Sequence, residues 1–440
     1  MKIAVIGTGY VGLVSGVCFS EFGFDVTCVD SDPEKIRQLQ GGAVPIFEPG
    51  LEDMLARNTL RLTFITDLEA ALSDAEAVFV AVGTPSRRGD GEADLTYVEA
   101  AARQVARAMR PGTVVVIKST VVVGTTRRVG EIIAEEVPGK DFSIAANPEF
   151  LREGSAIEDF MRPDRVVVGV DDERGEQVLR QLYRPLNLRE TPIVVTSLEN
   201  AEITKYAANA FLAMKVTFIN EIADLCEKAG GDVQDIARAI GIDNRIGSKF
   251  LHPGPGYGGS CFPKDTRAMA AIAARLGSPI RLVETTVRVN EERVEALAGK
   301  VLQAAGGDLH GRTVAVLGIA FKPNTDDVRE AASLTLIPAL QQAGADIRAH
   351  DPEAMDAARA MLSGVIWCDD AYQAVEGADV TVILTEWNEY RALDLNRLGA
   401  VMRGDSLVDF RNIYPLQEMQ QVPLRYISVG RPAISGNRAD

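Results

Sequence analysis

The strongest constraint on the fold lies in the first thirty residues, where a glycine pattern stands between two apolar runs. Residues 2–7, KIAVIG, are apolar and rich in β-branched side chains, which predicts a short buried strand. GTGYVG continues that run, so Gly7, Gly9 and Gly12 match G-x-G-x-x-G. A helical segment extends to about Phe22, and DVTCVD predicts a second strand that ends at Asp30. The segment therefore predicts a βαβ unit that binds a dinucleotide.

Each part of this unit has a physical reason. The first glycine permits a tight turn, the second lets the backbone approach a pyrophosphate, and the third allows close packing of helix on strand. The helix N-terminus offers free N–H groups to phosphate. Asp30 would accept hydrogen bonds from ribose hydroxyls and repel a 2′-phosphate, which predicts NAD rather than NADP. A strand–turn–helix unit that uses glycine only for packing is the alternative. The predicted cofactor contacts here are Gly7, Gly9, Tyr10, Val11, Gly12 and Asp30.

The alternation of strand and helix continues through the N-terminal third. Residues 75–85, 113–120 and 142–150 each predict a buried strand that ends in polar or turn residues. Ligands of doubly wound sheets bind beyond the carboxyl ends of the strands. Thr84, Thr120 and Glu149 therefore stand where the nicotinamide and a substrate would meet, although each threonine alone is also explained by a helix cap or turn.

Residues 197–229 contain neither glycine nor proline, which predicts one long helix capped by Ser197 and stopped at Gly230. Its length and apolar stripe predict a connector that also forms a homodimer interface. Lys205 and Asn209 are four residues apart and share one helix face. A solvated surface lysine is the alternative for Lys205.

The C-terminal third predicts a second α/β sheet. A buried strand at residues 313–317 leads to Gly318 without the second and third glycines, and further strands are predicted at 345–352, 378–387 and 406–412. This pattern favours binding of one nucleotide. The predicted fold class is thus α/β, with two Rossmann-like doubly wound domains joined by a long central helix. The predicted domains are residues 1–196, 197–305 and 306–440, and the tail beyond Val429 is predicted to be a mobile loop.

Composition excludes several classes of function. The net charge of -16 over 440 residues argues against a broad nucleic-acid or membrane surface. Neither a signal peptide nor a membrane-spanning apolar run is evident, and five scattered cysteines are typical of reduced thiols, which predicts a cytoplasmic protein. The three histidines are far apart, so no metal site is expected. Cys18, Cys28, Cys226 and Cys368 are expected to be small buried residues.

The fifth cysteine, Cys261, lies in HPGPGYGGSCFPKDT, residues 252–266, between a glycine-rich run and a lysine–aspartate pair. Five ordered blocks that include this loop resemble the nucleotide-sugar 6-dehydrogenases, the UDP-glucose/GDP-mannose dehydrogenase family. The blocks are GTGYVG, NPEFLREG (147–154), KYAANAFLA (205–213), PGPGYGGSCFPKDT (253–266) and GIAFKPNTDDVRE (318–330). The resemblance implies two successive NAD-dependent oxidations that convert the C6 alcohol of a sugar into a carboxylate.

The resemblance also implies residue roles. Cys261 matches a nucleophile whose thiohemiacetal is oxidised to a thioester, and Lys264 with a helix beginning near Asp265 would favour its thiolate. Lys205 and Asn209 match a pair that stabilises oxyanions on C6, and Asp265 a carboxylate that acts on water with Lys205. Thr120 resembles the residue that holds this water, and Glu149 a base or a group for thioester hydrolysis. The further implied cofactor contacts are Lys35, Thr84, Thr120, Glu153, Lys264 and Arg329. The implied substrate contacts are Glu149, Phe150, Leu151, Lys205, Asn209, Phe250, Leu251, His252, Pro253, Gly254, Tyr257, Gly258 and Lys322.

The cysteine loop looks like the UDP-glucose form, so UDP-glucose is the expected substrate, with GDP-mannose or a UDP-N-acetylhexosamine as alternatives. Two other classes of protein compete with this interpretation. A single-step NAD dehydrogenase would use Lys205 and Asn209 without Cys261. A non-catalytic nucleotide sensor would bind NAD without turnover.

Overall fold

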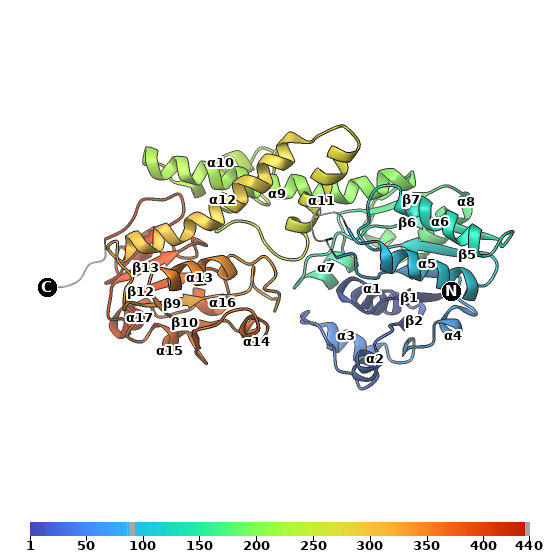
Figure 1. Ribbon diagram of the computed structural model, residues 1–440, viewed down its shortest axis with the longest axis horizontal. Coiled ribbons are helices and arrows are strands. Elements are labelled where there is room, and N and C mark those ends of the chain that lie inside the picture. The colour runs from blue at the N-terminus through green and yellow to red at the C-terminus, as the bar shows by residue number, and fades with distance from the viewer. Residues whose placement is uncertain (86, 88–92, 436–440) are drawn as a thin grey trace. The chain divides into compact units, whose positions relative to one another are not determined.

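The computed structural model describes residues 1–85, 87 and 93–435 (Figure 1). Its chain divides into two compact units, each with one sheet. Unit 1 comprises Met1–Ala208 and Ala271–Ser278, and unit 2 comprises Asn209–Ala270 and Pro279–Asp440. The predicted fold class is confirmed, because each unit is a doubly wound α/β layer structure and one long helix continues from the first unit into the second.

Unit 1 holds an eight-stranded sheet in the order β3-β2-β1-β4-β5-β6-β7-β8. Its strands are β1 (Lys2–Ile6), β2 (Asp25–Val29), β3 (Leu62–Ile65), β4 (Ala77–Val80), β5 (Thr113–Ile117), β6 (Phe142–Ala146), β7 (Val166–Val170) and β8 (Ile193–Thr196). Neighbouring strands are parallel except β6 and β7, where Ala146 lies opposite Gly169 in an antiparallel pair. The order reverses between β1 and β4, which makes this the point where a doubly wound sheet binds its ligand.

Helices cover both faces of this sheet because successive strand residues point to opposite sides. Ile3, Val5 and Phe79 pack against one group of helices, and Ala4 and Val78 against the other. The first group is α1 (Tyr10–Glu21), α2 (Pro33–Gln40), α3 (Leu51–Arg57), α7 (Ala156–Met161) and α8 (Glu173–Leu182), which is followed by a 3₁₀ helix (Arg184–Arg189). The second group is α4 (Leu68–Leu72), α5 (Thr96–Ala108) and α6 (Thr125–Glu136).

Unit 2 holds a six-stranded parallel sheet in the order β11-β10-β9-β12-β13-β14, with the same reversal between its first and fourth strands. The strands are β9 (Thr313–Leu317), β10 (Asp346–His350), β11 (Val365–Trp367), β12 (Val380–Ile383), β13 (Ser406–Asp409) and β14 (Arg425–Ser428). The helices are α10 (Val233–Gly241), α12 (Arg281–Ala304), α13 (Ser333–Gln342), α14 (Met355–Arg359), α15 (Ala371–Val375), α16 (Asn388–Arg391), α17 (Leu395–Val401) and α18 (Leu416–Met419).

The predicted long helix is α9 (Leu198–Ala229), which runs without interruption from unit 1 into unit 2. The hydroxyl of Ser197 caps it by accepting a hydrogen bond from the backbone N–H of Asn200 at 3.2 Å. Gly230 ends the helix with a φ of 75°, a conformation that favours glycine. A second helix, α11 (Phe262–Arg275), also continues from one unit into the other.

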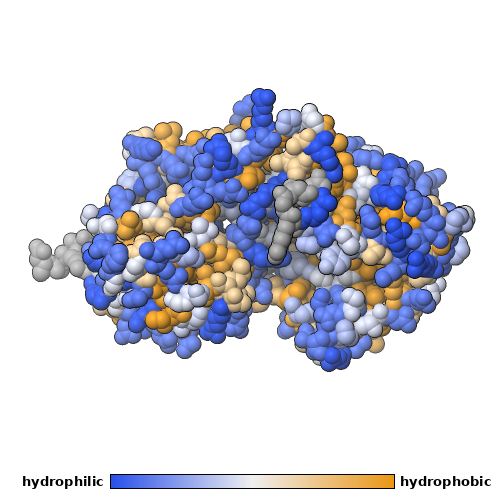
Figure 2. All heavy atoms as spheres, in the orientation of Figure 1, coloured by the Kyte–Doolittle hydropathy of each residue, from blue (hydrophilic) through white to orange (hydrophobic). Residues whose placement is uncertain are grey.

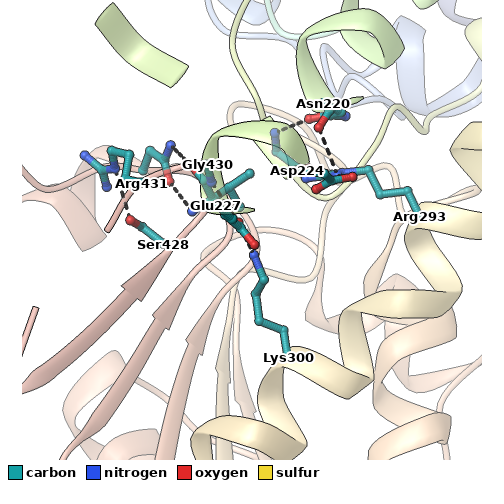
Figure 3. Close-up of polar contacts among 11 residues, drawn as sticks. Asn220, Asp224, Glu227, Arg293, Lys300, Ser428, Gly430 and Arg431 are labelled. Atoms are coloured by element: carbon teal, nitrogen blue, oxygen red, sulfur yellow. Dashed lines mark hydrogen bonds and ion pairs between the residues drawn. The ribbon is translucent and has the colours of Figure 1, made fainter. Parts of the chain in front are cut away.

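The prediction of a mobile tail is wrong for its described part. The backbone N–H of Gly430 donates to the carboxylate of Glu227 at 2.8 Å, and Arg431 donates to the hydroxyl of Ser428 at 3.0 Å (Figure 3). Arg431 is buried because its guanidinium finds several acceptors, and Ile434 pairs with Tyr426 in an antiparallel bridge. Residues 436–440 of the predicted tail lie outside the described residues.

Hydrophilic side chains dominate the face seen in Figure 2, with apolar patches between them. In the described part of the chain, none of the helices combines the length and the apolar character needed to cross a membrane.

Candidate active site

The three glycines of the loop after β1 differ in conformation and packing in the way that the sequence predicted. Gly7 has a φ of 94°, which allows the tight turn. A Cβ on Gly12 would lie 1.9 Å from the carbonyl oxygen of Gly7, so α1 packs too closely for any side chain there. A Cβ on Gly9 would meet no atom within 4 Å, and Gly9 caps α1 without a side chain. The loop thus leaves a clear approach to the first N–H groups of α1, which fits a pyrophosphate.

Asp30 connects the end of β2 to this loop. Its Oδ2 accepts hydrogen bonds from the backbone N–H and the hydroxyl of Thr8, both at 2.8 Å, and lies 3.3 Å from the ammonium of Lys35. Burial opposes ionisation of Asp30, but the hydrogen bonds from Thr8 and Asp32 outweigh it, so its pKa is lowered. The structure therefore places Asp30 and Lys35, both predicted cofactor contacts, beside the glycine loop as an ion pair.

The two predicted threonines are brought together beyond β4 and β5. The hydroxyl of Thr84 donates to the backbone carbonyl of Thr120 at 2.9 Å. Ser119 donates to the carbonyl of Val82 at 2.7 Å, which fastens the same two loops a second time. Thr120 is therefore held at the carboxyl edge of the sheet.

Glu149, beyond β6, forms a buried ion pair with Lys205 of α9. The Nζ of Lys205 lies 2.8 Å from Oε1 of Glu149, and the side chains are only 3% and 5% exposed, respectively. The backbone N–H of Leu151 donates to Oε2 at 2.5 Å, and the ring centroid of Phe150 is 5.6 Å from Nζ. Burial favours the neutral acid, but the charge of Lys205, the hydrogen bonds from Lys205 and Leu151 and the charge of Lys118 together outweigh burial, so the pKa of Glu149 is lowered. Lys205 is thus a buried partner of a carboxylate, and the alternative of a solvated lysine is wrong.

Glu48, a residue that the sequence analysis missed, connects the segment after Glu149 to α1. The hydroxyl of Tyr10 contacts the carboxylate of Glu48. The backbone N–H of Gly154 donates to Glu48 at 2.7 Å and to the Tyr10 hydroxyl at 3.0 Å. Glu153 therefore directly precedes Gly154, whose backbone is held by Glu48 and by the predicted contact Tyr10.

A second buried lysine of unit 1, Lys118, was also missed. Its Nζ donates to Oδ1 of Asn147 at 3.1 Å and to the hydroxyl of Tyr183 at 3.3 Å. The ring centroids of Phe160 and Tyr183 lie 5.7 and 6.0 Å from Nζ. Burial lowers the pKa of Lys118 to about 8. The sequence signal is a lysine at the end of an otherwise apolar strand, VVVIK.

This pKa predicts a pH-dependent stability. An unfolded lysine holds its proton up to its ordinary pKa of 10.5, whereas folded Lys118 loses it near pH 8. Between these values the unfolded chain binds more protons, so the free energy of unfolding rises with pH. We expect wild type to gain about 3 kcal/mol relative to Lys118→Met across this window. Urea unfolding of both proteins from about pH 7 to about pH 10.5 measures the difference. If the unfolding free energies of the two proteins changed with pH in parallel, a lowered pKa of Lys118 would be contradicted.

Unit 2 holds the cysteine loop, which is clamped rather than flexible. Asn220 of α9 accepts a hydrogen bond from the backbone N–H of Gly254 at 2.8 Å, and Arg293 of α12 donates to the Gly254 carbonyl at 2.7 Å. Asn290 of α12 accepts from the N–H of Tyr257 at 2.8 Å and donates to its carbonyl at 3.1 Å. The predicted contacts Phe250, Leu251, His252, Pro253, Gly254, Tyr257 and Gly258 all belong to this loop. The three clamping side chains were missed.

Cys261 lies at the end of the clamped loop, immediately before α11, and is partly exposed, whereas Cys18, Cys28, Cys226 and Cys368 are buried as predicted. Burial raises the pKa of the Cys28 thiol to about 12, which makes that thiol unreactive at neutral pH. The Sγ of Cys261 lies 3.5 Å from the hydroxyl of Ser260.

Asp265 on the first turn of α11 joins two other predicted residues. Asn209 of α9 donates to Oδ2 of Asp265 at 2.6 Å, and Lys264 pairs with Oδ1 at 2.6 Å. Asp265 is 1% exposed. Because α11 begins at Phe262, the N–H of Asp265 already donates to the carbonyl of Cys261, at 2.9 Å.

The cysteine loop also lines a pocket at the strand reversal of the second sheet. Phe321 follows β9, Leu384 follows β12 and Arg411 follows β13, and these residues face Pro255–Gly258 across the pocket. Arg411 donates to the carbonyls of Phe321 and Leu384, each at 2.6 Å. Ligands of doubly wound sheets bind at such a reversal. Arg411 had no distinguishing signal in the sequence.

Lys322 and Arg329, the predicted contacts from the C-terminal sheet, lie next to this pocket in the chain. The Nζ of Lys322 is 5.2 Å from the ring centroid of Phe321. The guanidinium of Arg329 pairs with Asp327 at 2.8 Å, and its carbonyl accepts from the N–H of Gly259 at 2.9 Å. The backbone of Arg329 therefore fastens the cysteine loop.

The predicted site residues divide between the units. Thr120, Glu149 and Lys205 belong to unit 1, and Asn209, Cys261 and Asp265 to unit 2. Lys205 and Asn209 are one turn apart on the continuous α9 helix, as their spacing predicted.

Three family models match the chain in succession, all of them for the UDP-glucose/GDP-mannose dehydrogenase family. The NAD binding domain matches residues 1–187, the central domain residues 199–292, and the UDP binding domain residues 315–415. The chain belongs to this family. It is an NAD-dependent dehydrogenase, and the open approach at Gly9 and the acceptor Asp30 fit such a cofactor. The resemblance inferred from the five sequence blocks is confirmed.

Individual relatives match over nearly their whole length. The UDP-glucose 6-dehydrogenase of Rhizobium meliloti (strain 1021) is 57% identical over 436 residues, which covers 98% of this chain and 100% of the relative. The structure of a UDP-glucose dehydrogenase from Pyrobaculum islandicum is 41% identical with a TM-score of 0.90 and covers 98% of both chains. A UDP-D-ManNAc dehydrogenase from Pyrococcus horikoshii is 28% identical with a TM-score of 0.85, over 98% of this chain and 99% of that chain.

Proposed function

We propose that the protein oxidises UDP-glucose to UDP-glucuronate in two steps, with two NAD reduced per sugar. The observation that carries the proposal is the partly exposed Cys261 next to the buried Asp265, which Asn209 and Lys264 hold in place. A single-step dehydrogenase needs no such thiol. The choice of UDP-glucose rests on the 57% identical relative, since the UDP-D-ManNAc dehydrogenase is only 28% identical.

In the first oxidation, the sugar's C6 hydroxyl would lose its proton to a base, with NAD as the hydride acceptor. Glu149 is suited to take this proton, directly or through water held by Thr120, because its lowered pKa keeps it ionised. The ammonium of Lys205 and the amide of Asn209, one turn apart on α9, are suited to stabilise negative charge on the C6 oxygen.

In the second oxidation, the Cys261 thiolate adds to the aldehyde and forms a carbon–sulfur bond. The resulting thiohemiacetal would lose its hydroxyl proton to a base and its remaining C6 hydride to a second NAD, which gives a thioester. Water that Asp265 and Lys205 orient then attacks the carbonyl carbon, and cleavage of the carbon–sulfur bond releases the carboxylate and the thiol. The N-terminus of α11 favours the thiolate of Cys261.

Substrate and cofactor would occupy the two strand reversals. The pyrophosphate of NAD would be contacted by Gly7, Gly9, Tyr10, Val11 and Gly12. The rest of the cofactor would be contacted by Asp30, Lys35, Thr84, Thr120, Glu153, Lys264 and Arg329. The strand reversal of the second sheet, with Lys322 beside it, would contact the UDP moiety. We also propose a cytoplasmic location and the three-domain division at residues 1–196, 197–305 and 306–440.

The test is the number of NADH formed per sugar nucleotide, with UDP-glucose limiting and NAD in excess. Two per sugar is expected, because both oxidations use NAD. One per sugar would indicate a single-step dehydrogenase, and none would mean that UDP-glucose is the wrong substrate or the protein is a sensor. Parallel assays with GDP-mannose and UDP-N-acetylmannosamine distinguish the alternative substrates.

Replacement of Asp30 tests the cofactor site. Asp30→Ala removes the acceptor of the buried Thr8 N–H and a partner for the ribose hydroxyls. We expect the KM for NAD to rise roughly tenfold to hundredfold, with kcat little changed. Asp67→Ala, which removes the cap of α4, is the matched control. An unchanged KM in initial-rate assays would remove Asp30 from the cofactor site.

A homodimer is proposed through α9. Phe211, Phe218 and Leu225 recur every seven residues and are 58%, 49% and 60% exposed. Exposed large apolar side chains at regular helical spacing are typical of an interface. We expect Phe218→Glu to raise the dissociation constant of the dimer at least roughly a hundredfold, measured by light scattering after gel filtration. Leu60→Glu, at a position 98% exposed outside α9, is the control. A monomeric wild type would refute the interface.

A further inference from the structure

Lys118 joins the two chain segments that carry Thr120 and Glu149. It follows β5 directly and precedes Thr120 by two residues, and Asn147 in the same way follows β6 and precedes Glu149 by two. The 3.1 Å hydrogen bond from Lys118 to Asn147 therefore connects the two turns by side chains. A backbone bond from the N–H of Asn147 to the carbonyl of Ile117, at 2.9 Å, runs beside it.

The partners of Lys118 are themselves held in place. The Oδ1 of Asn147 also accepts a hydrogen bond from the hydroxyl of Tyr183 at 2.5 Å, and its Nδ2 donates to the carbonyl of Val167 at 2.8 Å. Asn147 and Tyr183 are almost fully buried. The ammonium thus sits in a rigid polar network whose far end is anchored on β7.

Burying an ammonium between two strands costs free energy of hydration, whereas an apolar pair would pack there without that loss. The role of the Lys118 charge therefore depends on the titratable groups that face it. These are Tyr183 after α8, Glu149 after β6, Lys205 on α9 and Cys18 on α1. Burial raises the pKa of both Tyr183 and Cys18, so they are neutral. Two cations then face one carboxylate.

We propose that Lys118 is a positioning residue of the dehydrogenase, which fixes the turns that carry Thr120 and Glu149 and holds the Glu149 carboxylate ionised by its charge. The proposal rests on the proposed function, since it is there that Glu149 takes the proton. It is supported by mutual electrostatic effects, because the Lys118 charge lowers the pKa of Glu149 and Glu149 raises that of Lys118. With Lys205, the group has a net positive charge, which favours a developing oxyanion.

The test compares Lys118→Met with wild type in NADH formation over a range of pH. Loss of the cation should raise the pKa of Glu149, so the acid limb of kcat/KM should move up by about one pH unit. A loosened turn should also lower kcat roughly tenfold to hundredfold, with the KM for NAD within about twofold. Lys140→Met, which removes a lysine bonded to the carbonyl of Ala106, is the control and should change neither.

Lys118→Met should fold, because Asn147 keeps the Tyr183 hydroxyl as a donor. If it does not fold, Lys118→Gln retains a donor without the charge and should show the same shift of the acid limb. A lower kcat with an unmoved acid limb would make Lys118 a packing residue and overturn the proposal, as would unchanged kinetics. An inactive wild type would instead refute the proposed function, so the two failures are distinguishable.

Discussion

Cys261→Ala is expected to abolish formation of the uronic acid while NAD and the sugar nucleotide still bind. The first hydride transfer needs no thiol, but the second needs a carbon that again carries a transferable hydride. In the proposed mechanism only the thiohemiacetal on Cys261 supplies it. The rate of acid formation should fall by at least about a thousandfold, measured by chromatography of the sugar nucleotide product.

The side chain of Cys261 can be removed without large structural cost. It is partly exposed and lies 3.5 Å from the hydroxyl of Ser260. The loop around it is clamped by Asn220 and Asn290, neither of which touches the thiol in these contacts. Binding of both ligands, measured by calorimetry, should therefore stay within about threefold of wild type. Cys368→Ala, at a buried position of the second sheet, is the control. Near-native acid formation by Cys261→Ala would refute the thioester mechanism.

The features predicted correctly from the sequence are those that local chemistry determines. The glycine turn, the strand that ends at Asp30 and the 32 residues of α9 depend on neighbours within a few turns of the chain. The family resemblance implied that Lys205 acts on water together with Asp265, whereas the structure pairs Lys205 with Glu149. The periodicity placed Lys205 and Asn209 on one face but did not identify Glu149 as the partner of Lys205.

The missed features depend on contacts between distant segments. Strands β3, β7, β8, β11 and β14 were not assigned, and they lie at or next to the edges of the sheets. The antiparallel direction of β7 is a tertiary property. Asn290 and Arg293 act on a loop more than thirty residues away, and their role is invisible in a helix whose surface is mostly polar. The tail was predicted to be mobile from composition, yet Arg431 is buried among its acceptors.

Removal of the cation from the Glu149–Lys205 pair should have the second large effect. Lys205→Met leaves a carboxylate that is 5% exposed without its ion-pair partner at 2.8 Å. Breaking a buried pair on one side costs about 3–5 kcal/mol. The nearby charge of Lys118 still acts on Glu149, so the lower end of that range is expected. The kcat should fall at least about a hundredfold, because Lys205 is also proposed to stabilise the oxyanion.

The sign of the pH dependence separates this explanation from a simple loss of packing. In wild type the pKa of Glu149 is lowered, so the stability from the pair is present at neutral pH and is lost as the pH falls through that pKa. In Lys205→Met, burial without the lysine raises this pKa. The difference in unfolding free energy between the two proteins should therefore shrink on acidification. Lys215→Met, on the same helix but at a lysine that donates to the carbonyls of Ile246 and Gly247, should show no such trend.

A double variant completes the argument. Lys205→Met with Glu149→Gln removes both charges, so most of the lost stability should return, whereas NADH formation should stay low because both proposed roles are gone. Wild type, Lys205→Met, Glu149→Gln and the double variant form a double-mutant cycle. Urea unfolding and initial rates are measured on all four proteins. If the double variant were less stable than Lys205→Met alone, the penalty would come from packing around α9, and Glu149 would not be the buried charge that Lys205 neutralises.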